Sequence, residues 1–142
     1  MNAYDTDNIF AKIIRGEIPS HKVYEDEDVL VIMDVMPQAD GHALVIPKSP
    51  SRNILDADPM VLGAVIATTQ RIAKASKAAF AADGITVQQF NEAAGGQSVF
   101  HLHFHVIPRH DGMPLKAHNG QMEDQGILGA NCEKLKAALG DL

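Results

Sequence analysis

The sequence is short of the residues that would support several classes of protein. It contains a single cysteine, Cys132, among 142 residues, which excludes an intrachain disulfide and a zinc site built from several cysteines. It has no tryptophan, and aromatic residues make up only 5% of the chain. The longest apolar runs, such as Val29–Met33, are far shorter than the roughly 20 residues of a membrane-spanning helix. We therefore expect no membrane partner.

Basic residues are also few. The 12 lysines and arginines stand against 18 aspartates and glutamates, so the formal charge is -6 and a nucleic acid would meet no attractive field. Residues 1–14 lack the basic stretch and apolar core of a signal peptide, because Asp5 and Asp7 interrupt them. Apolar residues at 46% and charged residues at 21% are typical of globular proteins. We expect a soluble, cytoplasmic chain that folds as a single domain over residues 1–142.

The order of the expected elements indicates an α+β fold with an antiparallel sheet. A short amphipathic helix is expected over residues 8–15, and a long one follows Asp58, where apolar residues recur at helical spacing to about Ala82. Short turns rich in glycine and proline separate the strands, which favours antiparallel neighbours. The strands are expected over residues 21–25, 28–35, 42–47, 85–90 and 99–107, and a last helix over residues 127–139.

Histidines at alternate positions are the most unusual feature of the sequence. His101, His103 and His105 lie in a strand-like run, so they are expected to share one face, while the apolar residues between them share the other. The apolar face predicts a covering helix. The imidazole face predicts exposure to solvent, a metal or a substrate.

Three interpretations of the imidazole face are open. It could be a solvated strand face without a role. It could be a metal site, because neighbouring imidazoles about 6.6 Å apart can converge on one ion at about 2 Å, with a further ligand from elsewhere. It could also catalyse attack on phosphorus, because neutral imidazole is a nucleophile near pH 7 and a second histidine can donate a hydrogen bond to the phosphoryl oxygens.

The loop before the histidines favours the phosphate interpretation. Gly95 and Gly96 permit positive φ and close backbone approach, so that successive amide N–H groups could hold an anion. Asn91, Gln97 and Ser98 add neutral donors. The alternative is an ordinary hairpin turn.

The run His101-Leu102-His103-Phe104-His105-Val106-Ile107 resembles the defining motif of the histidine-triad (HIT) nucleotide-binding proteins. Residues 9–14, 33–38, 41–48 and 91–99 are similar to further segments of that family, in the same order. The resemblance covers about residues 8–110 and leaves residues 111–142 as a tail. It implies a five-stranded antiparallel sheet with one long and one short helix, a C-terminal tail helix and a homodimer.

The resemblance also implies a chemistry for the histidines, with a purine nucleotide such as an AMP derivative as substrate. His103 would attack the α-phosphorus and form a nucleotidyl-histidine that water hydrolyses. His101 would orient His103 through its backbone carbonyl, His105 would donate to a phosphate oxygen, and His42 would support them from the neighbouring strand. An exposed position without a role is the alternative for His42.

Nucleotide contacts follow from the same resemblance. Asp34 would accept hydrogen bonds from the ribose hydroxyls, although it could instead cap a turn with Gln38. The base would pack on Phe10, Ile32 and Val35, and the phosphate and leaving group would be held by Asn91, Gln97, Ser98 and the Val99 amide. An aromatic on an amphipathic helix, such as Phe10, could equally belong to the core.

Some HIT proteins carry paired N-terminal cysteines for structural zinc, and this chain has none there, so we expect no metal and no cofactor. The leaving group stays open between an amine and a second phosphate, as in a phosphoramidate or a dinucleoside polyphosphate. A nucleotide-binding adaptor with little turnover is the rival function, and a metal-dependent hydrolase is a third. An intact triad favours the enzyme.

Overall fold

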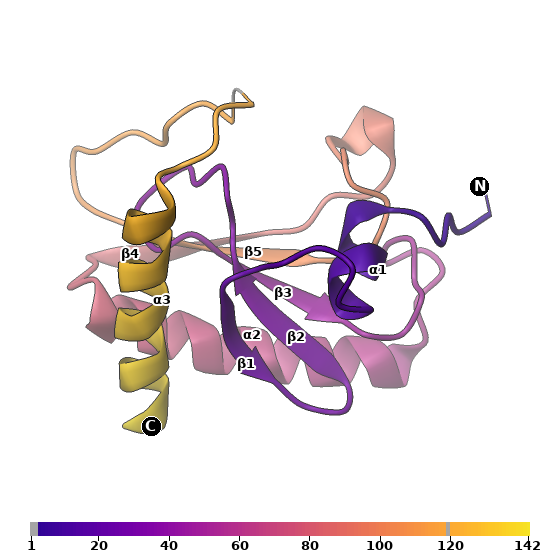
Figure 1. Ribbon diagram of the computed structural model, residues 1–142, viewed down its shortest axis with the longest axis horizontal. Helices are drawn as coiled ribbons and strands as arrows, with labels where there is room; N and C mark the ends of the chain where they lie inside the picture. The colour runs from indigo at the N-terminus through magenta and orange to yellow at the C-terminus, as the bar shows by residue number, and fades with distance from the viewer. Residues whose placement is uncertain (1–2, 119) are drawn as a thin grey trace.

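The structure is a computed structural model that describes residues 3–118 and 120–142. Its strands form one five-stranded antiparallel sheet in the order β1-β2-β3-β5-β4, which confirms the expected fold class (Figure 1). The strands are β1 Lys22–Glu25, β2 Val29–Met33, β3 Ala43–Pro47, β4 Gly84–Gln88 and β5 Phe104–Arg109. The helices are α1 Ile9–Ile14, α2 Pro59–Ala79 and α3 Gln125–Gly140, with a 3₁₀ turn, η1, at Ala93–Gly95.

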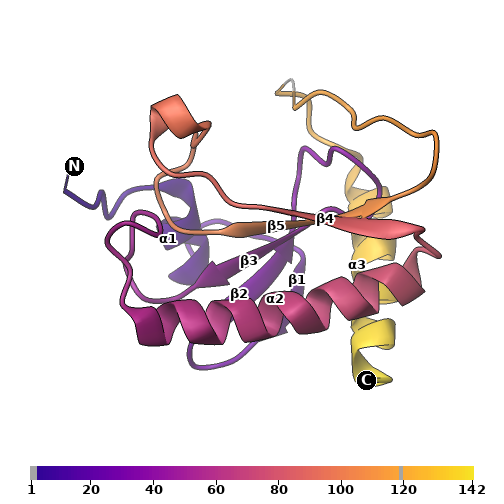
Figure 2. The same ribbon diagram turned by 180° about the vertical axis from the view of Figure 1, so that it is seen from behind.

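Both faces of the central strands are covered, which explains the unbroken apolar runs in β2 and β3. Along β2, Val31 packs into the core beneath α2, while its neighbours Leu30 and Ile32 pack on the other face, toward α1. β3 alternates in the same way, with Val45 on the α2 face. The long helix α2 lies along its face of the sheet in both views (Figures 1 and 2). A helix on each side leaves no polar face on these strands.

The C-terminal helix α3 completes the core on the α2 side. It packs against α2 and β1, and its residues Leu128, Cys132 and Leu135 are buried in the same cluster as the sheet. The Cys132 thiol donates to the Lys22 carbonyl of β1 at 3.2 Å. Residues that the HIT resemblance left as a tail therefore belong to the main core. In the part of the chain described, no helix is long and apolar enough to cross a membrane.

The last strand begins later than the sequence predicts. β5 starts at Phe104, so the expectation of a strand from residue 99 is wrong and only His105 of the triad lies in the sheet. β3 pairs with β5 only from Ala43↔Val106 to Val45↔Phe104. Pro47, at the end of β3, has no N–H to extend this ladder. The Leu102 amide donates instead to the carbonyl of Ser51 at 2.8 Å.

Leu135→Ala tests whether α3 belongs to the core. Leu135 is fully buried, so we expect the free energy of unfolding to fall by about 2–5 kcal/mol. Leu55→Ala is the matched control, because Leu55 is 67% exposed and should cost within about 0.5 kcal/mol. Urea denaturation of the two variants measures both changes. Equal, small losses would contradict the placement of α3 in the core.

Candidate active site

Three imidazoles meet on the α1 side of the sheet. His42 directly precedes β3, His103 directly precedes β5, and His105 lies within β5. The ring centroids of His103 and His105 are 5.0 Å apart, and those of His42 and His105 are 5.1 Å apart. His101 lies apart from this cluster, buried between Tyr4 and Pro47. The apolar residues between the histidines, Leu102, Phe104 and Val106, pack into the core beneath α2.

The backbone fixes the tautomer of His103. Its Nδ1 lies 2.6 Å from the carbonyl oxygen of His101. A carbonyl only accepts hydrogen bonds, so Nδ1 carries the ring proton and Nε2 keeps its lone pair. The edge of the Phe10 ring packs on the imidazole with centroids 4.8 Å apart, which holds the ring plane. His103 therefore offers a basic nitrogen.

His105 has the opposite tautomer. The backbone amide of Gln38 sets it by acting through His42. The Gln38 N–H donates to His42 Nδ1 at 3.1 Å, so the single proton of neutral His42 must be on Nε2. That nitrogen lies 2.9 Å from His105 Nδ1, which accepts its hydrogen. His105 consequently carries its own proton on Nε2. His105 thus offers a donor nitrogen, and the neighbouring His103 offers an acceptor nitrogen.

Burial keeps these imidazoles neutral. Burial lowers the pKa of His103 to about 4. Burial and, to a smaller extent, the neighbouring histidines together lower the pKa values of His42 and His105 to about 3. Loss of hydration disfavours the charged form, and no carboxylate compensates fully. All three are uncharged near neutral pH, as the tautomer assignments require.

Asp34 lies beside His42 and next to His118, a residue of the C-terminal tail. Its carboxylate is only 5% exposed, and it accepts from the Met36 amide at 2.8 Å. His42 Nε2 is 3.4 Å from one carboxylate oxygen, and His118 Nε2 is 3.5 Å from the other. Burial raises the pKa of this carboxyl group. The His118 imidazole thus lies beside one oxygen of the Asp34 carboxylate.

Residues 110–118 and 120–124, which we call the strap, run beside the loop between β2 and β3 (Figure 2). The Lys116 amide donates to the Gln38 carbonyl and the Glu123 amide to the Val35 carbonyl, both at 2.8 Å. Backbone bonds therefore hold the strap next to Asp34, and His118 reaches the site from it.

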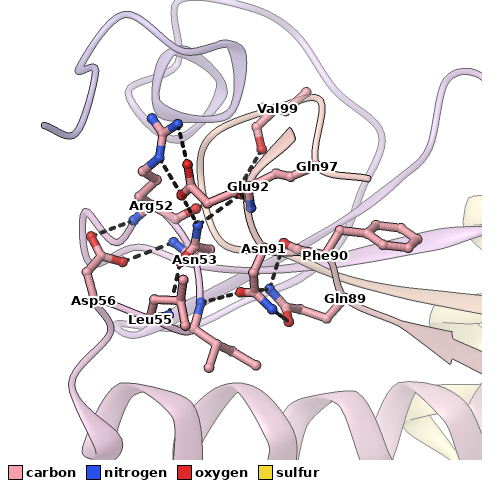
Figure 3. A network of polar contacts seen from close by, with 11 residues as sticks. Arg52, Asn53, Leu55, Asp56, Gln89, Phe90, Asn91, Glu92, Gln97 and Val99 are labelled. Carbon is pink, nitrogen blue, oxygen red and sulfur yellow. Dashed lines mark hydrogen bonds and ion pairs between the residues drawn. The ribbon is translucent and has the colours of Figure 1, made fainter. Parts of the chain in front are cut away.

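The loop that contains Gly95 and Gly96, which we call the glycine loop, is held by a network of polar contacts (Figure 3). The Gln97 amide group donates to the carbonyls of Arg52 and Val99, and its oxygen accepts from Asn53 Nδ2 and the Glu92 amide. Gln97 is only 5% exposed, and all four bonds end on protein atoms. These four bonds fill the hydrogen-bonding capacity of the Gln97 side chain, so its predicted contact with phosphate stays a prediction and would require one of them to break.

Asn91 is engaged in the same network. Its side-chain oxygen accepts from the Ile54 amide and from Gln89 Nε2, and its nitrogen donates to Gln89 Oε1. In this arrangement Asn91, like Gln97, ties the glycine loop to residues 51–56 (Figure 3). The predicted contact of Asn91 with phosphate likewise stays a prediction.

Glu92 is the strained point of that network. Its φ of 65° is in the left-handed region, which residues other than glycine rarely adopt. Its carboxylate accepts two bonds from Arg52, at 2.8 and 3.0 Å, and a third from Asn53. These bonds offset the backbone strain. They also pull the chain into the turn that brings Ser98 and Val99 toward α1.

Ser98 and Val99 line a cavity of about 570 Å³ together with residues of the N-terminal segment, among them Asp5, Asn8 and Ile9. Ser98 is exposed, so it is available to a ligand. Phe10 and Ile32 are 7% and 3% exposed and pack in the core beneath α1, whereas Val35 is half-buried at the site. The structure thus leaves Val35, Ser98 and Val99 at least partly exposed, whereas the Phe10 ring packs on His103.

Comparison with known proteins identifies the family. The HIT-domain model matches residues 15–112. The chain belongs to the HIT family. A crystal structure of a HIT-like protein involved in cell-cycle regulation from Bartonella henselae is 60% identical, with a TM-score of 0.90, and covers 96% of this chain and 99% of its own.

Two further HIT proteins bear on chemistry. A zinc-bound histidine triad family protein from Mycobacterium smegmatis is 34% identical, with a TM-score of 0.85, over 96% of this chain and 95% of its own. Adenylylsulfatase HINT3 from Arabidopsis thaliana is 41% identical over 103 residues, which is 72% of this chain and 52% of HINT3. The family therefore includes a protein named as a hydrolase.

One group of HIT-site residues has metal-ligating atoms close together. Single atoms of Asp34, His42 and His105 all lie within 4.8 Å of one another. The Gln38 N–H, however, occupies the lone pair of His42 Nδ1 and leaves the proton on Nε2, the nitrogen that faces the group. A metal ligand needs that lone pair free. The residues present do not fit a metal ion in this arrangement.

Four residues of the HIT site have no recognisable signal in the sequence. Tyr4, Arg52 and Asn53 act through contacts with residues 39 to 97 positions away, and no local spacing reports such contacts. His118 lies in the tail, where the sequence indicates an exposed residue. A tyrosine at the N-terminus and an Arg-Asn pair after β3 are too common to indicate a site.

The two tautomers can be observed directly by ¹⁵N NMR of histidine side chains. Near pH 7 we expect His103 to show a protonated Nδ1 and His105 a protonated Nε2, because their partners fix them. Both spectra should stay unchanged down to about pH 5, since their pKa values lie near 4 and 3. His21, which bonds to Gln125 away from the site, is the internal reference. The same tautomer in both residues would contradict the assignment.

Proposed function

We propose that this HIT protein is a nucleotide hydrolase or transferase that cleaves a purine nucleoside 5′-phosphate from an amine or phosphate leaving group. The observation that carries the proposal is the pair of opposite tautomers. His103 holds an available lone pair, and His105, 5.0 Å away between ring centroids, holds an N–H. A nucleophile beside a hydrogen-bond donor is what in-line attack on a phosphoryl group needs.

In the first step, His103 Nε2 forms a bond to the α-phosphorus as the bond to the leaving group breaks. The His105 N–H donates to a phosphoryl oxygen, where charge develops in the transition state. The Ser98 side chain and the Val99 amide, beside the cavity, bind the phosphate and the leaving group. Asn91 and Gln97 contribute by holding this loop. The leaving amine or phosphate departs with a proton taken from solvent or from a site donor.

In the second step, a water molecule attacks the nucleotidyl-His103 phosphorus and passes a proton to solvent, and the Nε2–P bond breaks, which returns neutral His103. His42 contributes by keeping the His105 proton on Nε2. The His101 carbonyl stabilises the positive charge that the His103 ring gains in the first step and loses in the second. Asp34 accepts the ribose hydroxyls after His118 moves away, and the base packs near Val35, with Phe10 and Ile32 supporting the wall from the core. No metal or cofactor takes part.

A nucleotide-binding adaptor with little turnover is the second candidate, and the closure of Asp34 by the strap favours it. An enzyme must release its product quickly, whereas a covered ribose site suits slow exchange. Turnover measurement separates the two. The panel is AMP amides, an AMP–lysine phosphoramidate and diadenosine polyphosphates; the relative named adenylylsulfatase adds adenylyl sulfate to it.

We also propose a homodimer. β4 lies at the end of the sheet order, and its Val87 is 48% exposed, so the strand presents an unprotected edge. Ile66 and Met60 of the adjacent helix α2 are 50% and 84% exposed. Pairing of two such edges about a two-fold axis would cover both features with one self-complementary surface.

His103→Ala should lower turnover to about 1% of the wild-type rate or less while AMP still binds, because the glycine loop remains in place. His105→Ala should lose roughly 10²–10³-fold, as removal of one transition-state donor does. His21→Ala, at a half-buried residue that bonds to Gln125 away from the site, is the control. Rates are measured on the best substrate of the panel, with and without EDTA, and we expect EDTA to have no effect.

The stereochemistry at phosphorus provides the decisive control for this prediction. Two successive in-line displacements retain configuration, whereas a single attack by water inverts it. A chiral phosphorothioate substrate should therefore give net retention. Inversion, or a His103→Ala variant that keeps more than a few per cent of the rate, would mean that water attacks directly.

Sedimentation should give the mass of two chains at micromolar concentration, because the β4 edge and the exposed face of α2 pair. Val87→Lys, which places a charge on the exposed edge, should shift the equilibrium toward single chains. Ile9→Lys, at a residue of α1 that is 46% exposed, is the control substitution. A wild-type protein that sediments as single chains would contradict the dimer.

A further inference from the structure

The His101 ring is held at both of its nitrogens. Its Nε2 lies 2.7 Å from the Pro47 carbonyl oxygen, which only accepts, so Nε2 carries the ring proton. Its Nδ1 therefore has a lone pair, and the hydroxyl of Tyr4 donates to it at 2.5 Å. Tyr4 also packs its ring edge against the imidazole, with centroids 5.6 Å apart. With Tyr4 in place, His101 is only 1% exposed.

The segment that contains His101 precedes β5, so no ladder of the sheet holds it. It is held by the two bonds of the His101 ring, by the Leu102 amide, which donates to the Ser51 carbonyl, and by the Gln97 side chain, which donates to the Val99 carbonyl. The carbonyl that fixes His103 belongs to His101 itself, at 2.6 Å from Nδ1 of His103. A shift of the backbone at His101 would therefore move the carbonyl that fixes the His103 tautomer.

We propose that Tyr4 is a positioning residue for the reaction at His103. Its hydroxyl holds the His101 ring in one tautomer and one orientation, and the His101 carbonyl then keeps the proton of His103 on Nδ1. Tyr4 does not touch the reacting atoms. The catalytic part of this inference rests on the proposed function, whereas the link from Tyr4 to the His103 tautomer is independent of it.

The pKa values of Tyr4 and His101 are shifted in the directions that keep both side chains neutral. Burial raises the pKa of Tyr4, so the hydroxyl keeps its proton. The charged groups acting on it are Arg15, at the end of α1, and Asp5. Burial lowers the pKa of His101, and a donor on Nδ1 also favours the uncharged ring. Loss of the hydroxyl should therefore raise the pKa of His101.

Tyr4→Phe tests the proposal, and Tyr24→Phe is its matched control. The chain has only these two tyrosines, and the Tyr24 hydroxyl donates to Asp26, away from the histidines. Loss of one neutral hydrogen bond corresponds to about a three- to tenfold lower kcat, with KM changed by less than about twofold. The acid limb of the kcat profile should move to higher pH, because protonated His101 repels charge on His103. Tyr24→Phe should match the wild type.

¹⁵N NMR of the same variants tests the structural link without any substrate. In Tyr4→Phe, we expect the His103 signals to move from the Nδ1–H tautomer toward an average of the two tautomers. Unchanged His103 signals would overturn the proposal, and so would moved signals with unchanged kcat and pH profile in an active enzyme. If no substrate of the panel is turned over, the proposed function fails while the NMR comparison still decides the role of Tyr4. A lower melting temperature alone would assign Tyr4 a purely structural role and overturn the proposal.

Discussion

A neutral imidazole carries one ring proton, and the arrangement of this site depends on which nitrogen holds it. The His101 carbonyl draws the proton of His103 to Nδ1, and the Gln38 amide drives the proton of His42 to Nε2. From those two backbone contacts follow the donor on His105, the lone pair on His103 and the poor fit for a metal. Side chains perform the chemistry, but main-chain groups determine what each can do.

Burial makes that arrangement possible. A charged imidazole would carry protons on both nitrogens and lose the distinction between His103 and His105. The low pKa values of about 4 and 3 keep the rings neutral well below pH 7. The same burial disfavours the charge of Asp34, whose carboxylate accepts from the Met36 amide and lies 3.4 Å from His42 Nε2 and 3.5 Å from His118 Nε2. A ligand that donates hydrogen bonds to Asp34 would therefore stabilise this carboxylate.

Local patterns in the sequence predicted the helices and strands that are determined by residues close to one another along the chain. The apolar runs of β2 and β3 and the helical stripe of α2 appear where they were expected, because periodicity reports burial directly. The start of β5 was wrong because it depends on Pro47, a residue of another strand whose missing N–H stops the ladder. Spacing alone also placed all three histidines on one strand face, whereas His101 is buried elsewhere.

Polar side chains were harder to predict than apolar ones for the same reason. The sequence indicated that the residues around the glycine loop contact phosphate, and in the structure the side chains of Gln97 and Asn91 bond to protein. Whether an amide meets a ligand or a neighbouring loop depends on long-range contacts such as those from Arg52 and Asn53. Such contacts leave no periodic trace in a single sequence.

The strap has a consequence for how substitutions near Asp34 act. Two of its bonds to the loop between β2 and β3 use only main-chain atoms, with the amides of Lys116 and Glu123 as donors, and a third joins the Gln38 side chain to the Lys116 carbonyl at 3.4 Å. No strap side chain takes part in these three bonds, so a substitution of His118 can change the size or charge beside the Asp34 carboxylate and leave them in place. Access to Asp34 can therefore be altered from the strap without any change to His42, His103 or His105.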